Sequence, residues 1–293
     1  MEARPAVTTK SDVKAQGGTE PRIAVLGSNG MLGHDFCDLA GDVHKFDLPE
    51  WNATKSSCLD LCSAYPIIVN CAAFTNVEAA EKNEDVCRQV NSVFPGQLGT
   101  AAKATGSWIL HISTDFVFGS TGSESLDENS PTKPLNVYGQ SKLDGEIALA
   151  DSGCNCCILR IQWTYGHHGP NFIKKIIQSI DTQRQVPVVN DQIGSPTWTS
   201  NVAMVMTQLM SKRSTGLWHF ASSGYASRYE VARHVAEVYG KGSIIPCKSS
   251  EFKTAVSRPM NSRFDCAKIE SIGIKCPDWK ESLDIYLKER ALH

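Results

Sequence analysis

The sequence predicts a doubly wound α/β fold, with a parallel sheet of the Rossmann type and a smaller C-terminal substrate lobe. Short, almost uninterrupted apolar runs alternate with stretches of helical spacing from Arg22 onward. A glycine-rich turn follows the first of these runs, and 293 residues are enough for two lobes. Near-continuous apolar strands are typical of a parallel sheet that is covered on both faces.

The individual elements follow from these runs. We predict strands over 22–26, in the run ending at Phe46, and over 66–70, 107–113 and 156–161. Apolar residues at helical spacing predict helices over 31–40, 77–90, 91–104 and 137–150. The second half is less regular, but Ser227 followed by Glu230 forms a capping box that predicts the start of a further helix.

The chain divides into three predicted parts. Residues 1–21 are polar and carry both signs of charge, so we expect a disordered arm. Residues 22–165 and 196–222 are expected to form a dinucleotide-binding domain. Residues 166–195 and 223–293 are expected to form the substrate-binding lobe, over the sheet edge where such folds bind ligands.

Composition excludes several classes of protein. A net charge of −2 lacks the basic excess of a nucleic-acid binder, and no apolar run is long enough for a membrane helix. The eleven cysteines are scattered and no signal segment precedes them, so we expect reduced thiols in a cytoplasmic protein. We interpret Cys154, Cys156 and Cys157 as part of a strand, His111 as a core residue and His167–His168 as a solvated pair. No metal site is expected.

A glycine pattern links the first strand to the first helix. Gly27, Gly30 and Gly33 allow a tight turn and close approach of the backbone to a pyrophosphate at the helix N-terminus. The alternative is a plain tight turn. Asp47, twenty residues on, is placed to bind the adenosine ribose, unless it is simply a solvated loop acid.

A second group of polar residues follows the fourth strand. Tyr138 and Lys142 are four apart and share one helix face, where a cation is expected to lower the pKa of the phenol. Thr114 and Asp115 lie at the carboxyl edge of the sheet, close to the expected cofactor pocket. This arrangement predicts general acid catalysis by Tyr138.

Several segments resemble the extended short-chain dehydrogenase/reductases, and more narrowly the dTDP-4-dehydrorhamnose reductase family. The similarity spans nearly all of 22–287 and includes GSNGMLG, VNCAAFTNVEAAE, STDFVFG, PLNVYGQSKLDGE, LRIQWTYG, VVNDQIGSPTW and RPMNSRFDCAKIE. It implies that Tyr138 donates a proton, Lys142 binds the nicotinamide ribose and Thr114 holds the substrate carbonyl.

The resemblance also implies the binding residues. The cofactor would contact the turn and two further segments: Gly27, Asn29, Gly30, Met31, Leu32, Gly33, Asp47, Asn52, Ala72, Ala73 and Phe74. Asn52 stands where the family often has aspartate, and its amide can still bond adenine. The sugar nucleotide would contact Thr114, Asp115, Tyr138, Trp163 and Arg258. Arg258 suits a diphosphate, but an arginine that only bridges two loops is an equal alternative.

These implications define an expected function. We predict reduction of the 4-keto group of a nucleotide-linked 6-deoxyhexose, dTDP-4-dehydro-L-rhamnose to dTDP-L-rhamnose, with NADPH or NADH. Two alternatives remain: another sugar-nucleotide reductase or epimerase of this fold, and a non-catalytic subunit resembling the β subunit of methionine adenosyltransferase. We favour the enzyme because Trp163 and Gly194, around which that subunit looks altered, are both present. No nucleic acid or membrane partner is expected, and a homodimer is left open.

Overall fold

The main sheet consists of six parallel strands, in the order β10–β5–β4–β3–β1–β2. The computed structural model describes residues 22–119, 122–252 and 256–290, so the predicted arm over 1–21 lies outside the described residues. The strands are β1 Ile23–Leu26, β2 His44–Phe46, β3 Ile67–Asn70, β4 Trp108–Thr114, β5 Asn155–Ile161 and β10 Gly216–Phe220. The predicted doubly wound sheet is confirmed.

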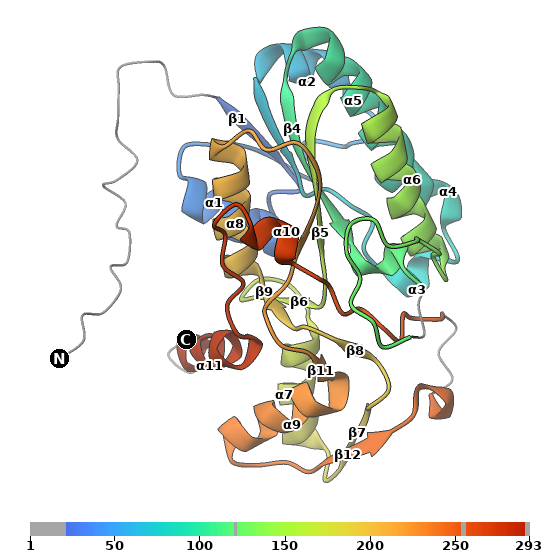
Figure 1. Cartoon of the computed structure of the whole chain (residues 1–293), viewed down its shortest axis with the longest axis vertical. Helices are drawn as coiled ribbons and strands as arrows, with labels where there is room; N and C mark the ends of the chain where they lie inside the picture. Colours follow the sequence, from blue (N-terminus) through green and yellow to red (C-terminus); the bar gives the residue numbers. More distant parts are fainter. Residues whose placement is uncertain (1–21, 120–121, 253–255, 291–293) are drawn as a thin grey trace, which may run out of the picture.

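Helices cover both faces of this sheet (Figure 1). One face packs against α1 Met31–Ala40, α8 Thr199–Ser211 and α10 Ala267–Glu270, and the other against α2 Cys58–Ala64, α5 Phe94–Thr105 and α6 Val137–Asp151. Alternate residues of β1 serve the two faces: Ile23 and Val25 pack with the first group, while Ala24 and Leu26 pack with the second. Burial on both sides explains why the strands read as continuous apolar runs.

The order of the strands creates a crevice at one point of the sheet. The strands β2 and β3 lie on opposite sides of β1, so the chain leaves β1 and β3 in opposite directions. Parallel α/β sheets bind ligands outside the carboxyl ends of their strands at such a switch point. Gly27 follows β1 there, and Cys71 and Ala72 follow β3.

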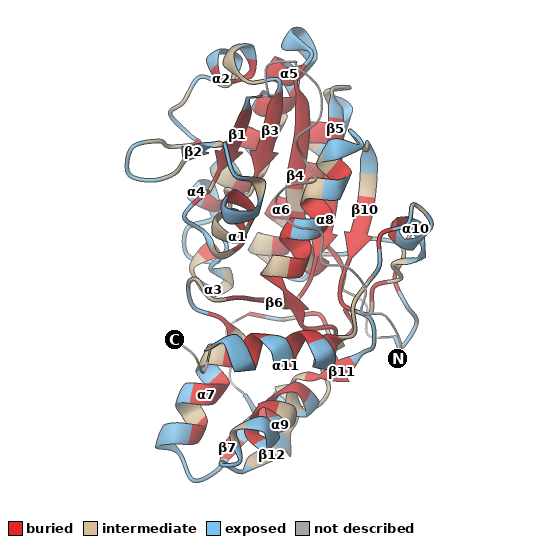
Figure 2. Ribbon diagram, turned by 90° about the vertical axis from the view of Figure 1, so that its left-hand side faces the viewer, coloured by how far each residue is buried: buried red, intermediate tan, exposed pale blue. Residues whose placement is uncertain are grey.

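A second group of elements forms a smaller lobe below the carboxyl edge of the sheet (Figure 2). Its helices are α7 Phe172–Thr182, α9 Arg228–Tyr239 and α11 Trp279–Arg290, which share their own apolar cluster. Its paired short strands are β6 Thr164–Tyr165 with β9 Thr197–Trp198, β7 Val186–Val189 with β12 Ile244–Cys247, and β8 Ile193–Gly194 with β11 Ala226–Ser227. The predicted capping box at Ser227 and Glu230 is confirmed. The predicted domain boundaries stay predictions.

The helix predicted over 77–90 is wrong as a single element. The structure has α3 Val77–Ala80, α4 Glu84–Arg88 and a π-helical turn Gln89–Val93, so the next helix begins at Phe94 rather than Asn91. Turn residues break the first stretch at Lys82 and Asn83, where backbone amides bond back to Ala79 and Ala80. The π turn places the side chain of Asn91 inside the protein.

Two further expectations concern membranes and cysteines. Within the described residues, every helix is too short or too polar to span a bilayer. Cys156 and Cys157 are buried in β5, as predicted for a strand, but the prediction is wrong for Cys154, which precedes β5 and is half-buried.

Candidate active site

The glycine turn is a close-packed cradle at the switch point of the sheet. Gly27 has a φ of 75°, and a Cβ built on it would lie 2.6 Å from the backbone nitrogen of Ala72. A Cβ on Gly33 would lie 2.1 Å from the carbonyl oxygen of Gly27. Gly30 begins α1 without a side-chain cap, so first-turn N–H groups remain available to an anion. This geometry fits a dinucleotide pyrophosphate.

The remaining residues predicted in this turn divide between surface and core. Asn29 is exposed and Met31 is half-buried, whereas Leu32 is buried in the apolar cluster beneath the sheet. The side chain of Leu32 supports α1 from within this cluster, so only its main chain is left for a ligand contact.

Asp47 is built into the cradle. One of its carboxylate oxygens accepts the backbone N–H of Asn29 at 2.7 Å, and the other accepts the N–H of Leu48 at 2.8 Å. The carboxylate therefore positions the turn in addition to any ribose contact. Asn52 uses its Oδ1 locally, accepting from the N–H and hydroxyl of Thr54, so its Nδ2 is the group left for adenine.

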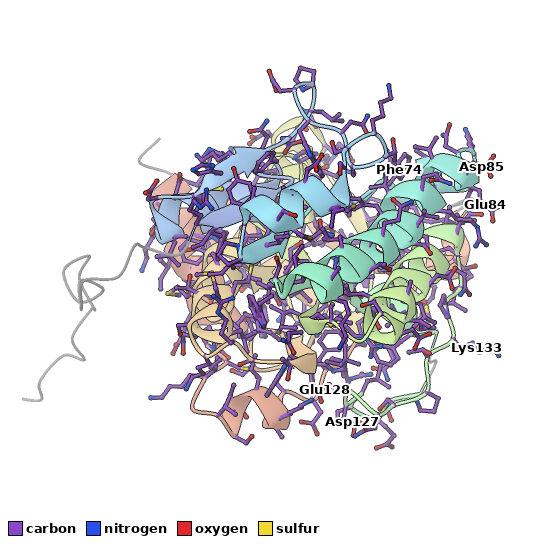
Figure 3. The ribbon with its side chains drawn as sticks, turned by 90° about the horizontal axis from the view of Figure 1, so that it is seen from above. Phe74, Glu84, Asp85, Asp127, Glu128 and Lys133 are labelled. Atoms are coloured by element: carbon purple, nitrogen blue, oxygen red, sulfur yellow. The ribbon has the colours of Figure 1, made fainter. Side chains whose placement is uncertain are left out.

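The segment predicted to line the adenosine is held by two buried asparagines. Asn70 Oδ1 accepts the N–H of Ala72 at 3.1 Å. Asn91, fully buried, accepts the N–H of Phe74 at 2.8 Å and donates to its carbonyl at 3.0 Å; Phe74 is labelled in Figure 3. Ala72, Ala73 and Phe74 are all half-buried. Sequence reasoning missed both asparagines, because nothing in their spacing distinguishes them from surface amides.

Tyr138 and Thr114 meet at the start of α6. The side chain of Asn136 caps this helix by accepting the N–H of Gly139 at 2.8 Å, which places Tyr138 in the first turn. The Tyr138 ring packs edge-to-face on Phe116 with centroids 5.4 Å apart. Burial raises the pKa of the phenol above its ordinary value, and a hydrogen bond with Thr114 opposes that rise.

Lys142 lies under this pair rather than beside the phenol. The side chain is 2% exposed, and its Nζ donates to the Ile112 carbonyl at 2.7 Å and lies 3.3 Å from His111 Nε2. Burial lowers the pKa of Lys142 to about 8, and the nearby Glu146 carboxylate opposes that shift. The expectation that Lys142 lowers the pKa of Tyr138 is wrong in this arrangement, because the ammonium turns toward β4 and burial of the phenol dominates.

A chain of buried contacts connects Lys142 to the cradle. His111 Nδ1 lies 3.0 Å from Asn70 Nδ2, and Asn70 in turn holds Ala72 against Gly27. Burial and the neighbouring Lys142 charge keep the pKa of His111 far below its usual range, so its ring is neutral. The prediction of a core histidine is confirmed, but no pattern in the sequence indicates its contact with Lys142.

Asp115 joins the two lobes at this point. Its carboxylate, 2% exposed, accepts from Ser262 at 2.6 Å and from Thr114 at 3.2 Å. Burial raises its pKa, against the effect of these hydrogen bonds and of the charge on Arg228. The structure thus brings together Thr114, Asp115 and Tyr138, as the sequence predicted.

Gly194 and Arg228 of the smaller lobe pack against the ring of Trp163. A Cβ on Gly194 would lie 2.8 Å from Trp163 Cε2, and the guanidinium carbon of Arg228 lies 3.6 Å from the ring centroid. Trp163 also has a φ of 46°, an unusual backbone conformation for a bulky residue. Arg228 therefore covers one face of the indole, and Gly194 approaches its six-membered ring, although the residue is only half-buried.

A cavity of about 1030 Å³ lies between the sheet domain and the lobe. It reaches Leu135, which precedes α6, and is lined by Arg228 and Arg258, whereas Thr114, Tyr138 and Trp163 are not among its lining residues. The Arg258 guanidinium pairs with Glu78 and donates to the Val256 carbonyl, so in this structure it bridges two segments. The volume suits a nucleotide-sized ligand.

The expected histidine pair is not simply solvated. His168 stacks on His34 with centroids 3.4 Å apart, and its Nε2 lies 4.0 Å from an Asp35 oxygen. These three residues have potential metal-binding atoms within 4.8 Å of one another. The two rings are nearly parallel, so both could face one ion only after a ring rotation, and we assign no metal.

Comparison with known proteins identifies relatives over almost the whole chain. The family model described as the RmlD substrate binding domain matches residues 21–292. The dTDP-4-dehydrorhamnose reductase of Sinorhizobium fredii is 36% identical over 282 residues, covering 89% of this chain and 95% of that protein.

Solved structures agree. A dTDP-4-dehydrorhamnose reductase from Clostridium acetobutylicum has a TM-score of 0.89 at 29% identity, covering 92% of this chain and 99% of that one. The enzyme of Bacillus anthracis, solved in complex with NADP, has a TM-score of 0.88 at 29% identity and covers 92% and 100%. The chain therefore belongs to the RmlD substrate binding domain family, the family of these dTDP-4-dehydrorhamnose reductases.

Proposed function

We propose that this protein is a reductase that uses NADPH or NADH to convert the 4-keto group of a dTDP-linked 6-deoxyhexose to an alcohol. The observation that carries the proposal is the meeting of Thr114 with Tyr138 at the start of α6, the helix whose Lys142 is connected by buried contacts to the glycine cradle. The names of the relatives support dTDP-4-dehydrorhamnose as the substrate.

The glycine cradle supports the choice of cofactor. Clearances at Gly27 and Gly33 leave no room for a Cβ, and the uncapped start of α1 suits a pyrophosphate. The bound nicotinamide would supply the hydride. The NADP complex of the Bacillus anthracis relative supports this assignment.

The residues of the chain would then control the proton and the carbonyl oxygen. Thr114 would turn its hydroxyl from the Asp115 carboxylate to donate a hydrogen bond to the oxygen, and Tyr138 would transfer its phenolic proton as negative charge develops there. A raised phenol pKa keeps Tyr138 protonated until that moment, and an alkoxide is basic enough to take the proton. Lys142 would turn from the Ile112 carbonyl to the nicotinamide ribose.

The alternative of a non-catalytic subunit predicts the same fold but no turnover. The feature that distinguishes the enzyme from the subunit is the presence of Trp163 and Gly194. Their contact supports the enzyme because the Trp163 ring also packs on Arg228, which lines the cavity. A cytoplasmic location and a homodimer stay predictions.

A direct assay tests the proposal. The purified full chain is mixed with dTDP-4-keto-6-deoxy-mannose and either NADPH or NADH, and the nicotinamide absorbance is followed. We expect oxidation of at least one cofactor, dependent on the sugar nucleotide and lost in Tyr138→Phe. No absorbance change with either cofactor would contradict the proposal and favour the subunit.

A further inference from the structure

Arg228 is a half-buried cation whose hydrogen-bonding groups have no partner in the described part of the chain. Its guanidinium carbon lies 3.6 Å from the centroid of the Trp163 ring and 4.9 Å from that of Phe172. Across residues 22–119, 122–252 and 256–290, no hydrogen bond or ion pair engages this guanidinium. Asp115 is near enough to favour its charge, but that carboxylate is held by Ser262 and Thr114.

The other arginine of the cavity is already engaged. Arg258 pairs with Glu78, whereas the guanidinium carbon of Arg228 lies over the Trp163 ring, 3.6 Å from its centroid. A guanidinium that stacks through its face keeps its N–H edges free for oxygens in its own plane. Arg228 therefore holds its N–H groups in position for a ligand, whereas Arg258 connects two segments of the protein.

The cavity has a charge opposite to that of the chain as a whole. Its lining includes Arg228, Arg258 and Lys175 but only one acidic residue, Glu78, although the chain carries a net charge of −2. A cationic cavity of about 1030 Å³ in an acidic protein selects an anionic ligand. In a nucleotide-linked sugar, the negative charge is on the diphosphate.

We propose that Arg228 binds the diphosphate of the sugar nucleotide, with Trp163 and Phe172 as the platform that orients it. This inference rests on the proposed function for the identity of the ligand. Trp163 then acts as a positioning residue for Arg228, which covers one face of its ring.

Binding of nucleotides without the sugar tests this role. The affinities of dTDP, dTMP and UDP are measured by calorimetry for the full wild-type chain, R228M, R228K and R233M. Methionine can still pack on Trp163 but carries no charge. Arg233 is the matched control, since it lies on the same helix, exposed and paired with Glu237. Melting temperature and NADPH affinity show whether each variant is folded.

We expect R228M to bind dTDP about 10- to 100-fold more weakly than wild type, because a charge-assisted contact is lost. R228K should retain part of the affinity, and R233M all of it. Folded R228M that binds dTDP within twofold of wild type would overturn the role of Arg228. If wild type binds UDP but not dTDP, and UDP binding is weakened in R228M, the role of Arg228 is supported and the nucleotide base named in the proposed function is wrong. If wild type binds neither nucleotide, both proposals fail.

Discussion

The glycine cradle with the residues that hold it, here the cofactor wall, and the Arg228 side of the cavity, here the substrate wall, use their polar groups differently. On the cofactor side, Asp47, Asn70 and Lys142 all bond to the protein itself and hold the backbone in place. On the substrate side, Arg228 is stacked on rings and keeps its N–H groups for a ligand. The cofactor wall therefore recognises its ligand mainly by shape and main-chain groups, whereas the substrate wall recognises its ligand by the preoriented charge of Arg228.

The largest expected effect concerns Tyr138, the proposed proton donor. Tyr138→Phe removes the proton donor but keeps the ring that packs on Phe116. We expect turnover to fall about 10²- to 10⁴-fold with little change in NADPH affinity. Steady-state kinetics and cofactor titration measure the two quantities. Near wild-type turnover, with the same product, would remove Tyr138 from its role.

The shape of the cofactor wall is tested by Gly33→Ala. The added Cβ would lie 2.1 Å from the Gly27 carbonyl, so the turn must shift at a cost of about 1–3 kcal/mol. We expect NADPH affinity to fall at least about tenfold. Gly96→Ala is the control, because Gly96 lies in α5 outside the cradle and its Cβ would lie 3.1 Å from the Cβ of Ala148. Equal affinities in the two variants would contradict the argument from shape.

Trp163→Ala tests whether the Trp163 ring holds the charged Arg228 in position in the substrate wall. Loss of the ring removes the platform of Arg228 and the contact with Gly194. We expect a loss of about 3 kcal/mol in the free energy of unfolding and weaker dTDP binding, with NADPH affinity unchanged. Denaturant unfolding and calorimetry measure these effects. Unchanged dTDP affinity in the folded variant would separate Trp163 from Arg228.

The pH dependence reports on Lys142. Its pKa in the folded protein is about 8 against an ordinary value of 10.5, so between these values the unfolded chain binds more protons. Its contribution to the free energy of unfolding therefore rises with pH over that window. Activity should move in the other direction: kcat/KM should fall above about pH 8 if the ammonium is required. Persistence of full activity to pH 10 would exclude that requirement.

The smallest expected effect distinguishes two uses of Asp47. Its charge opposes a ribose 2′-phosphate, while its oxygen holds Asn29. Asp47→Asn removes only the charge, and Asp47→Ala removes both. We expect both variants to shift preference toward NADPH, and only Asp47→Ala to weaken both cofactors. An unchanged ratio of NADH to NADPH use in both would contradict a ribose contact.

The sheet and the cradle were predictable because their signals are local. Apolar runs and glycine spacing appear within a few residues, and α1 occurs over 31–40 as predicted. Arg228, Asn91 and His111 were not found as site residues, since each acts on a partner far away in sequence. The direction of the Lys142 side chain could not be predicted from the sequence either. Helical spacing puts Lys142 on the same helix face as Tyr138, but its Nζ donates to the Ile112 carbonyl and therefore points toward β4.

The most direct test of the account follows the hydride itself. NADPH labelled with deuterium at C4 is incubated with the full chain and dTDP-4-keto-6-deoxy-mannose, and the sugar product is analysed by NMR. The account predicts deuterium at C4 of the product sugar and an unlabelled proton on its hydroxyl in water. A product without deuterium at C4, or recovery of unchanged keto sugar, would contradict it.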